Sequence, residues 1–548
     1  MNSASRLVAA VFAAALVMLP VTLRADDDKT AAKPAATEKA ADTAPPADST
    51  TEGTVDAGGQ HIAYTAVAGI LTVGATDTQD GQLGVDGKPQ PGSQLALSAP
   101  KEPADAPPVA RMSYVAYFKK DAKAEDRPIT FFYNGGPGSS TVWLHMGSLG
   151  PKHVVTDMDT HLPAAPYKLE DNAETLLDVS DLVFIDAPGT GFGRLIGKDA
   201  EKAFWGVDED GGAFSRFIAR FIGKYSRWNS PKFIFGESYG TTRSAVLAKM
   251  LEDRSIDVNG VILLSQIFNF SVFLDAAEGN PGVDLPYELA LPTYAATAWY
   301  HKKLSPQPTA LEPFLKEVEE YAMGPYSHAL AEGTDLNDAE KQAVAEKLHG
   351  YTGLPVAYLI KANLRVDGGE FEKNFEDAED MTTGRYDTRF TGPTIDPLSK
   401  EADYDPQSAA ISSAYVSLLN DYMRRVLKYG EGQTYLPDID VFSNPATRWD
   451  FKHNDNPLNL NVSSDLADAM KTNPRLKVML NGGYYDLATP FFEAEYEEKH
   501  LPIPASLAKN IEYDWYESGH MVYVRSECRK QLHDRVAAFI KGASGVAQ

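Results

Sequence analysis

Short apolar runs recur along the chain and alternate with stretches whose apolar residues have helical spacing. The clearest runs are 128–133, 181–186, 232–236, 258–264 and 476–480. Each is short and bounded by polar or turn-forming residues, which is typical of a buried strand. Just before residue 232, apolar residues at helical spacing form one face: Phe214, Phe217, Ile218, Phe221, Ile222 and Tyr225. Buried strands that alternate with helices predict an α/β domain with a mainly parallel central sheet.

Two segments near the start of this pattern have a different character. Residues 61–67 and 111–118 contain alternating and aromatic strand formers and are separated by turns rich in Gly and Pro. This pattern predicts two antiparallel strands at the edge of the sheet, with ordered structure beginning near His61.

Residues 271–440 break the strand–helix rhythm. They contain long helical patterns, one of which starts at Asn337 with Glu340 three residues later, the spacing of a capping box. We therefore expect a catalytic α/β domain formed by 61–270 and 441–548, with 271–440 as a mostly helical cap insertion. An insertion at the carboxyl end of the sheet would cover the active site.

The first residues resemble an export signal. Arg6 precedes an apolar stretch from Leu7 to Val21, and Ala25 supplies a small residue before Asp26. The apolar stretch is short for a membrane span, although an uncleaved anchor remains an alternative. We expect residues 1–25 to be a signal peptide and 26–60, rich in Ala, Pro and Thr, to be a disordered linker. The protein is then exported, either periplasmic or secreted, with no membrane span in its mature form.

Composition excludes some classes of partner. The formal net charge of −25 argues against nucleic acid and anionic membrane surfaces as partners. Cys528 is the single cysteine, so the chain has no internal disulfide. It lies in a C-terminal stretch with apolar residues at helical spacing, which predicts a buried side chain rather than a catalytic thiol. Composition does not define an oligomeric state.

The segment from Gly236 to Gly240 carries the strongest chemical signal. A buried strand leads directly into Gly-Glu-Ser-Tyr-Gly, and a helical stretch follows from Thr241. This is the strand–turn–helix context of a nucleophile elbow, in which the turn lifts the serine hydroxyl clear of the sheet. We expect Ser238 to be the nucleophile of an enzyme.

A serine nucleophile needs a base and an acid. His520 lies in a loop of small residues before the C-terminal helix, and its imidazole titrates near neutral pH. Asp486 follows the late strand 476–480, so the order Ser, acid, His is that of the α/β-hydrolase fold. Asp514 is the rival acid, but it precedes His520 too closely to fold back onto it easily. We expect Asp486 to orient the imidazole of His520.

Two glycine-rich segments follow predicted strands. Asn134-Gly-Gly-Pro-Gly-Ser-Ser140 allows backbone N–H groups to approach a developing oxyanion, and it lacks the Lys that ends a phosphate-binding loop. Gly189-Thr-Gly-Phe-Gly193 lacks the spacing of a dinucleotide fingerprint and is read as a turn beside the active site. The sequence contains no His-Glu-x-x-His and no Cys/His cluster, so no metal site and no cofactor are expected.

These segments together resemble the serine carboxypeptidase family, peptidase family S10. The matching motifs span most of the chain in family order: Asn134-Gly-Gly-Pro-Gly, Leu149-Gly-Pro151, Asp186-x-Pro-x-x-Gly191-Phe192, Gly236-Glu-Ser-Tyr239, Asn481-Gly-x-x-x-Asp486 and Gly519-His-Met-Val522. The lack of disulfides is similar to the bacterial members.

The resemblance implies roles for particular residues. It implies a triad of Ser238, Asp486 and His520 and an oxyanion hole made by the N–H groups of Gly136 and Tyr239. It further implies that the C-terminal carboxylate of a peptide substrate binds to Asn134, to the N–H of Gly135 and to Glu237. The carboxyl group of Glu237 and the carboxylate of the substrate can lie together only if one of them is protonated, which implies activity at acid pH.

Three positions depart from the family pattern. Phe132 replaces a Trp, Ser139 replaces a Cys, and Ser148 stands where many eukaryotic members have a second Glu. These changes predict a carboxylate site with fewer polar groups and therefore a weaker preference for free C-termini.

The resulting hypothesis is an exported serine carboxypeptidase that acts on peptides with a free C-terminus through an acyl-enzyme on Ser238. An esterase or acyltransferase could use the same three residues, because this fold supports many acyl transfers. A catalytically silent binding module is a further alternative.

Overall fold

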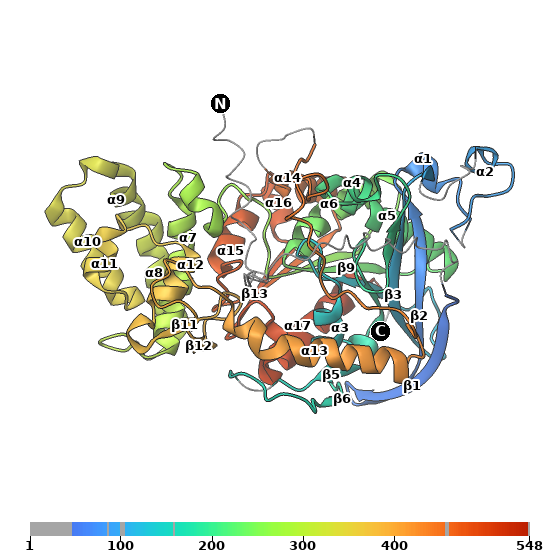
Figure 1. The fold of residues 1–548 in the computed structure, drawn as a ribbon, viewed down its shortest axis with the longest axis horizontal. Coiled ribbons are helices and arrows are strands. Elements are labelled where there is room, and N and C mark those ends of the chain that lie inside the picture. The colour runs from blue at the N-terminus through green and yellow to red at the C-terminus, as the bar shows by residue number, and fades with distance from the viewer. Residues whose placement is uncertain (1–45, 85–86, 99–104, 157–158, 455–459, 546–548) are drawn as a thin grey trace, which may run out of the picture.

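The computed structural model describes residues 46–84, 87–98, 105–156, 159–454 and 460–545. A twisted sheet with helices on both faces forms one part, and helices from the middle of the chain lie to one side of it (Figure 1, left). Among the described residues, no helix combines the length and apolar character needed to cross a membrane. The predicted signal peptide, residues 1–25, falls outside this part of the chain.

The central sheet has the strand order β1–β2–β3–β7–β4–β9–β10–β13–β14, with β8 paired to β3. The strands are β1 (Ser49–Ala57), β2 (Gln60–Gly74), β3 (Val109–Lys119), β4 (Ile129–Tyr133), β7 (Asp181–Ile185), β8 (Arg194–Ile196), β9 (Lys232–Glu237), β10 (Gly260–Leu264), β13 (Lys477–Gly483) and β14 (Ile511–Tyr516). From β7 to β14 in this order all neighbours are parallel, whereas β1, β2, β3 and β8 pair antiparallel. This confirms the predicted α/β class with a mainly parallel central sheet.

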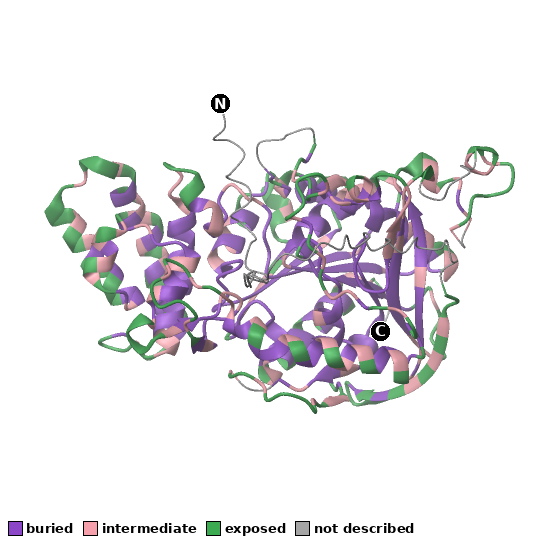
Figure 2. Cartoon of the chain, viewed as in Figure 1, coloured by how far each residue is buried: buried purple, intermediate pink, exposed green. Residues whose placement is uncertain are grey.

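Helices bury both faces of this sheet. On one face α5 (Val207–Lys224), α6 (Tyr239–Asp253) and α14 (Ser463–Thr472) share an apolar core with Phe131. On the other, α3 (Val142–Gly147), α13 (Pro406–Arg425) and α17 (Ser526–Ala543) share a core with Phe132. Adjacent residues of a strand point to opposite faces, so the apolar run of β4 serves two cores. Figure 2 shows the parallel strands buried between these layers. Double-sided burial explains why the runs are continuous rather than alternating.

The remaining short elements are distributed over both parts. They are α1 (Asp77–Asp80), α2 (Gln94–Leu97), α4 (Ala200–Phe204), α15 (Phe491–Lys499), α16 (Ala505–Ala508), η2 (Leu176–Asp178), η3 (Leu274–Gly279), η7 (Val522–Val524) and the pairs β5 (Lys152–Val154) with β6 (Leu169–Asp171) and β11 (Met381–Thr383) with β12 (Thr391–Pro393). Of these, η3, β11 and β12 lie beside the helices of the insertion. Cys528 is buried in α17, as its helical context predicted.

The insertion after β10 forms its own helical layer. Its elements are α7 (Leu285–Tyr300), α8 (Leu311–Tyr321), η4 (Ala322–Tyr326), α9 (Ser327–Glu332), η5 (Gly333–Asp335), α10 (Asp338–Thr352), α11 (Val356–Lys361), α12 (Gly368–Asn374) and η6 (Asp377–Glu379). Their apolar faces share one core, which also receives Tyr485 and Phe491 from the α/β part. Asn337 caps α10 by accepting hydrogen bonds from the N–H groups of Ala339 and Glu340, so the predicted helix start is confirmed.

Two predicted boundaries were wrong. The linker predicted for 26–60 ends earlier, because residues 49–57 form β1 and pair with β2 along their whole length. β1 is an edge strand with one exposed face, so it needs few apolar residues, and its polar composition concealed it. The second error concerns α13, which lies inside the insertion predicted for 271–440. Its residues Ile411 and Tyr415 pack in the main core and not with the insertion helices.

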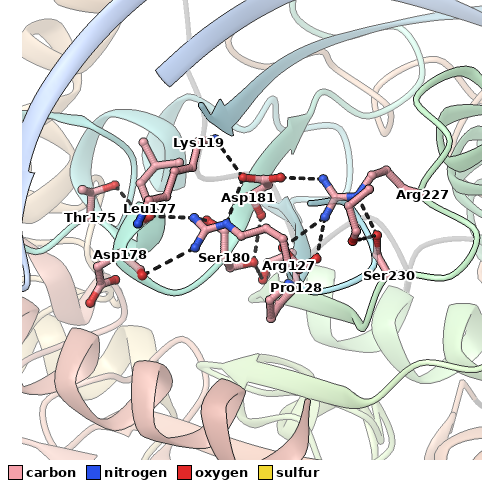
Figure 3. Close-up of polar contacts among 12 residues, drawn as sticks. Lys119, Arg127, Pro128, Thr175, Leu177, Asp178, Ser180, Asp181, Arg227 and Ser230 are labelled. Carbon is pink, nitrogen blue, oxygen red and sulfur yellow. Dashed lines mark hydrogen bonds and ion pairs between the residues drawn. The ribbon is translucent and has the colours of Figure 1, made fainter. Parts of the chain in front are cut away.

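A buried charge cluster ties the amino ends of three neighbouring strands together. Asp181 opens β7 and lies between two guanidinium groups, 3.1 Å from Nε of Arg127 and 2.5 Å from Nη1 of Arg227. Figure 3 shows this arrangement, with the Lys119 backbone N–H also donating to Asp181. Arg127 precedes β4 and Arg227 precedes β9. The cluster therefore aligns β4, β7 and β9 at the sheet end opposite to the Ser238 turn.

Candidate active site

Ser238 occupies the turn between β9 and α6. Its backbone has φ of 61° and ψ of −133°, the strained left-handed conformation expected of a nucleophile elbow. The turn needs a small residue at 236, because a Cβ there would lie 2.2 Å from the carbonyl oxygen of Gly240. Ser238 is only partly buried, so the elbow presents its side chain at the carboxyl end of the sheet.

His520 and Asp486 meet as predicted. Nδ1 of His520 lies 2.8 Å from Oδ2 of Asp486, and both side chains are buried. The carboxylate also accepts hydrogen bonds from the backbone N–H groups of Ala488 and Thr489 and from the Thr489 hydroxyl. Burial alone would lower the pKa of His520, but the charge of Asp486 and the hydrogen bond to it outweigh burial and raise this pKa.

The end of β10 connects the serine turn to the histidine loop. The N–H of Ser238 donates to the carbonyl of Leu264 at 3.0 Å, and the next residue, Ser265, donates its hydroxyl to the carbonyl of His520 at 2.7 Å. On its other side, the N–H of His520 donates to the carbonyl of Tyr386 at 2.6 Å, and the two rings are 4.9 Å apart. The imidazole is thus held between the sheet and a loop that follows the helical insertion.

The rival acid is occupied elsewhere. Asp514 lies on β14, where its carboxylate is 2.6 Å from Nε of Arg535. This ion pair supports the choice of Asp486 as the partner of His520.

The glycine-rich loop after β4 lies directly against the start of α6. A Cβ at Gly135 would be 2.5 Å from the backbone nitrogens of both Tyr239 and Gly240. Gly136 has φ of 100°, a conformation that glycine adopts easily. The structure therefore places Gly135, the residue before Gly136, against the backbone of Tyr239, and the N–H groups of Gly136 and Tyr239 are those predicted to form the oxyanion hole.

Glu237 and Asn134 form a buried polar cluster with Tyr523. The Tyr523 hydroxyl lies 2.8 Å and 3.2 Å from the two carboxyl oxygens of Glu237. Asn134 is hydrogen-bonded through its side chain to both Glu237 and Tyr523. Burial raises the pKa of Glu237 to about 7, although His520, Tyr523 and Asn134 oppose the shift. The cluster thus places a carboxyl group that is protonated at mildly acid pH next to Ser238.

Two of the three substituted positions, Phe132 and Ser148, contribute no side chain to this cluster. The ring of Phe132 is stacked in the core between Phe184 and Phe235. The hydroxyl of Ser148 donates to the carbonyl of Leu144 at 2.6 Å within its own helix.

A fully buried ion pair supports the loop from behind. Nε of Arg243 lies 2.6 Å from Oδ2 of Asp210, and Nη1 of Arg243 donates to the carbonyl of Asn134 at 2.6 Å. The guanidinium also stacks 4.4 Å from the ring of Phe214. Arg243 therefore fixes the backbone where the glycine-rich loop begins.

Sequence reasoning missed three residues of the site. Thr489 follows Asp486 by three positions, a spacing typical of local side-chain-to-backbone turns, so it could have been found. Tyr523 follows His520 by three positions, but nothing local indicates that it reaches Glu237. Arg243 lies inside a helix, where its role depends wholly on tertiary contacts.

The second glycine-rich segment forms a turn, as predicted. Gly191 forms a β-bridge with Leu436. Asp186, which precedes the segment, accepts a hydrogen bond of 2.9 Å from the N–H of Thr141. Among the described residues, one group of acids is close enough to hold a cation: Glu278, Asp367 and Glu370. Lys400 is ion-paired with Glu278 and Glu370 there, and the group shares no residue with the site above.

Comparison with solved structures finds a similar fold in a carboxypeptidase. The chain is similar to a prohormone-processing carboxypeptidase from Saccharomyces cerevisiae, Kex1(Δ)p, with a TM-score of 0.51 and 12% identity over 87% of this chain and 91% of that one. Weaker similarities include a proline iminopeptidase from Mycobacterium smegmatis (TM-score 0.33, 12% identity, 80% and 97% covered) and the peroxisomal α/β-hydrolase Lpx1 from Saccharomyces cerevisiae (TM-score 0.33, 9% identity, 88% and 91% covered). The mainly parallel sheet, with Ser238 in the turn between β9 and α6, confirms the predicted α/β-hydrolase fold.

No curated protein matches the chain. The sequence model of one family, described as serine carboxypeptidase, matches residues 109–541. This range is well over half of the chain and contains the elbow, the Asp486 turn and the His520 loop. The chain therefore belongs to the serine carboxypeptidase family and is a serine-type hydrolase.

Proposed function

We propose that the protein is an exported serine carboxypeptidase that hydrolyses the C-terminal peptide bond of its substrates through an acyl-enzyme on Ser238. The observation that carries this proposal is the position of Glu237. Its carboxyl group directly precedes the nucleophile and is hydrogen-bonded to Tyr523 and Asn134 in a buried cluster. Such a group can recognise a substrate carboxylate beside the bond that is cleaved.

The first half-reaction forms the acyl-enzyme. Ser238 Oγ bonds to the carbonyl carbon of the peptide while its proton moves to Nε2 of His520. The carbonyl oxygen becomes an oxyanion, which accepts hydrogen bonds from the N–H groups of Gly136 and Tyr239. When the intermediate collapses, the peptide C–N bond breaks and the leaving amine takes the proton from His520. The C-terminal amino acid then departs.

The second half-reaction releases the shortened peptide. His520 removes a proton from water as the water attacks the acyl carbon; the ester bond between this carbon and Ser238 Oγ then breaks, and Oγ takes the proton from His520. Throughout, Asp486 holds the Nδ1–H tautomer of His520 and stabilises the imidazolium. The hydrogen bonds that Ala488 and Thr489 donate to Asp486 keep its carboxylate in place for this role.

Recognition of the free C-terminus rests on hydrogen-bond donors. Asn134 contributes its amide N–H, Gly135 its backbone N–H, and Glu237 an O–H while it is protonated. The Oδ1 atom of Asn134 accepts from the N–H of Leu144 at 3.0 Å, which turns the amide NH₂ toward Glu237. The donor set supports peptides with free C-termini as substrates at mildly acid pH.

A matched set of blocked dipeptides tests this function. We expect purified protein to release the C-terminal amino acid from N-blocked dipeptides with a free carboxylate faster than from the amides. A Ser238→Ala protein is the control and should release none. Turnover confined to esters would instead indicate the esterase or acyltransferase alternative. A protein that neither turns over nor reacts with a fluorophosphonate at Ser238 would be a silent binding module.

We further propose that residues 1–25 direct export and are removed, leaving the mature protein periplasmic or secreted. The charged, apolar and small-residue regions around Arg6, Leu7–Val21 and Ala25 support this. N-terminal sequencing of protein from cell fractions is the test. A mature end near Asp26 outside the cytoplasm is expected, and recovery of intact Met1 would contradict the proposal.

A further inference from the structure

Tyr523 is a buried neighbour of Glu237 to which the mechanism above assigns no role. It lies in η7, three residues after His520, and its side chain is fully shielded from solvent. Its hydroxyl is 2.8 Å from Oε2 and 3.2 Å from Oε1 of Glu237. Burial raises the pKa of Tyr523 well above 10, so its O–H remains a donor across the working pH range.

The bonds around Tyr523 have a defined direction. Leu144 donates to Oδ1 of Asn134, so the NH₂ of Asn134 is its donor group, with one N–H directed to the Glu237–Tyr523 pair and the other left for the substrate carboxylate. Tyr523 can accept from Asn134 and must use its single proton for Glu237. The phenol lies within hydrogen-bond distance of both carboxyl oxygens and closer to Oε2, so it holds the orientation of the Glu237 carboxyl group.

We propose that Tyr523 is a substrate-positioning residue: by donating to Glu237, it orients that carboxyl toward the substrate C-terminus and sets the pH range in which free-acid peptides bind. This inference rests on the proposed function of the site. It extends that function to a residue outside the triad, the oxyanion hole and the predicted carboxylate site.

The sign of the pH effect follows from hydrogen-bond strength. A phenol bonds more strongly to an ionised carboxylate than to a neutral carboxylic acid, so Tyr523 lowers the pKa of Glu237 relative to a cluster without the hydroxyl. The other groups that act on Glu237 are Asn134, His520 and Asp486, and Tyr415 faces Tyr523. Removing only the phenol oxygen leaves the side chains of His520, Asp486 and Tyr415 in place and takes one hydrogen-bond acceptor from Asn134.

The test is Tyr523→Phe, which deletes one oxygen and retains the ring. With the free-acid dipeptide at pH 5, we expect kcat/KM to fall about 3- to 10-fold, mainly through KM, because one orienting hydrogen bond is lost. The alkaline fall in kcat/KM should move up by about 0.5–1 pH unit. With the matched amide, kcat/KM should stay within about twofold of wild type, because the amide brings no carboxylate to the cluster.

Two comparison variants separate positioning from packing. Tyr422→Phe removes another buried hydroxyl, which accepts from Tyr117 at 3.1 Å, and should leave both pH profiles unchanged. In a Glu237→Gln background, Tyr523→Phe should no longer move the alkaline limb. Thermal unfolding verifies that each variant is folded.

The outcomes distinguish this inference from the proposed function. A wild-type enzyme that shows no preference for the free acid would overturn the proposed function itself. A wild-type enzyme with that preference, combined with equal losses on acid and amide in Tyr523→Phe or with an unmoved alkaline limb, would overturn only the role of Tyr523.

Discussion

The Oδ2 atom of Asp486 lies 2.8 Å from Nδ1 of His520, in a pocket where neither side chain is exposed. Thr489 and the backbone of Ala488 hold the carboxylate from the other side. This contact selects the tautomer in which Nε2 of His520 is free to act as a base toward Ser238.

Substitution of the triad should remove nearly all turnover. Ser238→Ala or His520→Ala should lower kcat by about 10⁶, and Asp486→Asn by about 10⁴ because the imidazole adopts the wrong tautomer. Steady-state kinetics on a blocked dipeptide measures these losses. Near-normal turnover in Ser238→Ala would refute the assignment of the nucleophile.

The pH dependence of free-acid peptides should follow Glu237. Its pKa of about 7 means that the carboxyl donates a hydrogen bond below this pH and is an anion above it. The kcat/KM for free-acid peptides should therefore fall as pH rises through about 7, mainly through KM. Glu237→Gln keeps a donor at every pH and should flatten this fall.

Matched amides provide the control for that prediction. They bring no carboxylate to Glu237, so their activity should persist to higher pH. At the acid end it should be limited by protonation of His520, whose pKa is raised. Identical profiles for acid and amide would contradict recognition of the carboxylate and favour the esterase alternative.

Gly135→Ala should disable the oxyanion loop. A Cβ at this position meets backbone atoms of Tyr239 and Gly240 at 2.5 Å, so the loop must move away from α6. Loss of one oxyanion donor lowers kcat by about 10²–10³, and we expect a fall of at least that size. Gly350→Ala, in the exposed face of α10 with open space around it, is the matched control and should leave kcat unchanged.

Removal of Asp181 should lower stability without altering the chemistry. Asp181→Ala leaves the buried guanidinium groups of Arg127 and Arg227 without their shared carboxylate. The free energy of unfolding should fall by about 3–5 kcal/mol, as measured by urea denaturation. Asp534→Asn, which breaks an exposed pair with Lys530, should change it by no more than about 1 kcal/mol. A similar effect of both substitutions would contradict the structural role of the cluster.

Glu498 should make the fold less stable as pH rises. Burial raises the pKa of Glu498 from 4.5 to about 8, and neither carboxyl oxygen has a hydrogen-bond partner. The folded state therefore keeps this proton up to a higher pH than the unfolded state does. The contribution of Glu498 to the free energy of unfolding is complete below pH 4.5 and is lost as pH rises through 8. Glu498→Gln should unfold like wild type at pH 5 but be more stable by about 2–4 kcal/mol at pH 9. Urea denaturation at both pH values measures this, and a pH-independent difference would contradict it.

Local patterns predicted much of the fold and the site. The buried strands were visible because both faces of the sheet are covered, which makes each strand a continuous apolar run. Ser238, Asp486 and His520 were visible because each lies in a turn or loop of small residues at the end of a strand or before a helix. Parallel strands end at the same edge of the sheet, so residues in those turns converge even when they are far apart in the chain.

Other features, such as β1 and the packing of α13, could not be predicted because they depend on contacts between segments that are distant in the chain. β1 has the composition of a linker, and only its pairing with β2 makes it a strand. α13 has an ordinary helical pattern, which does not tell whether its apolar face packs on the insertion or on the main core. Propensity specifies the type of an element and leaves its partner undetermined.

The sequence by itself thus determined the α/β class, the nucleophile elbow at Ser238 and the order in which its acid and base follow. Only the tertiary structure decided which groups surround them. Tyr523 and Glu237 are 286 residues apart in the chain, and their contact forms only when folding brings η7 to the carboxyl end of β9. The pKa of Glu237 depends on that contact and on burial, because the cost of removing a charge from water is set by neighbours that folding brings together.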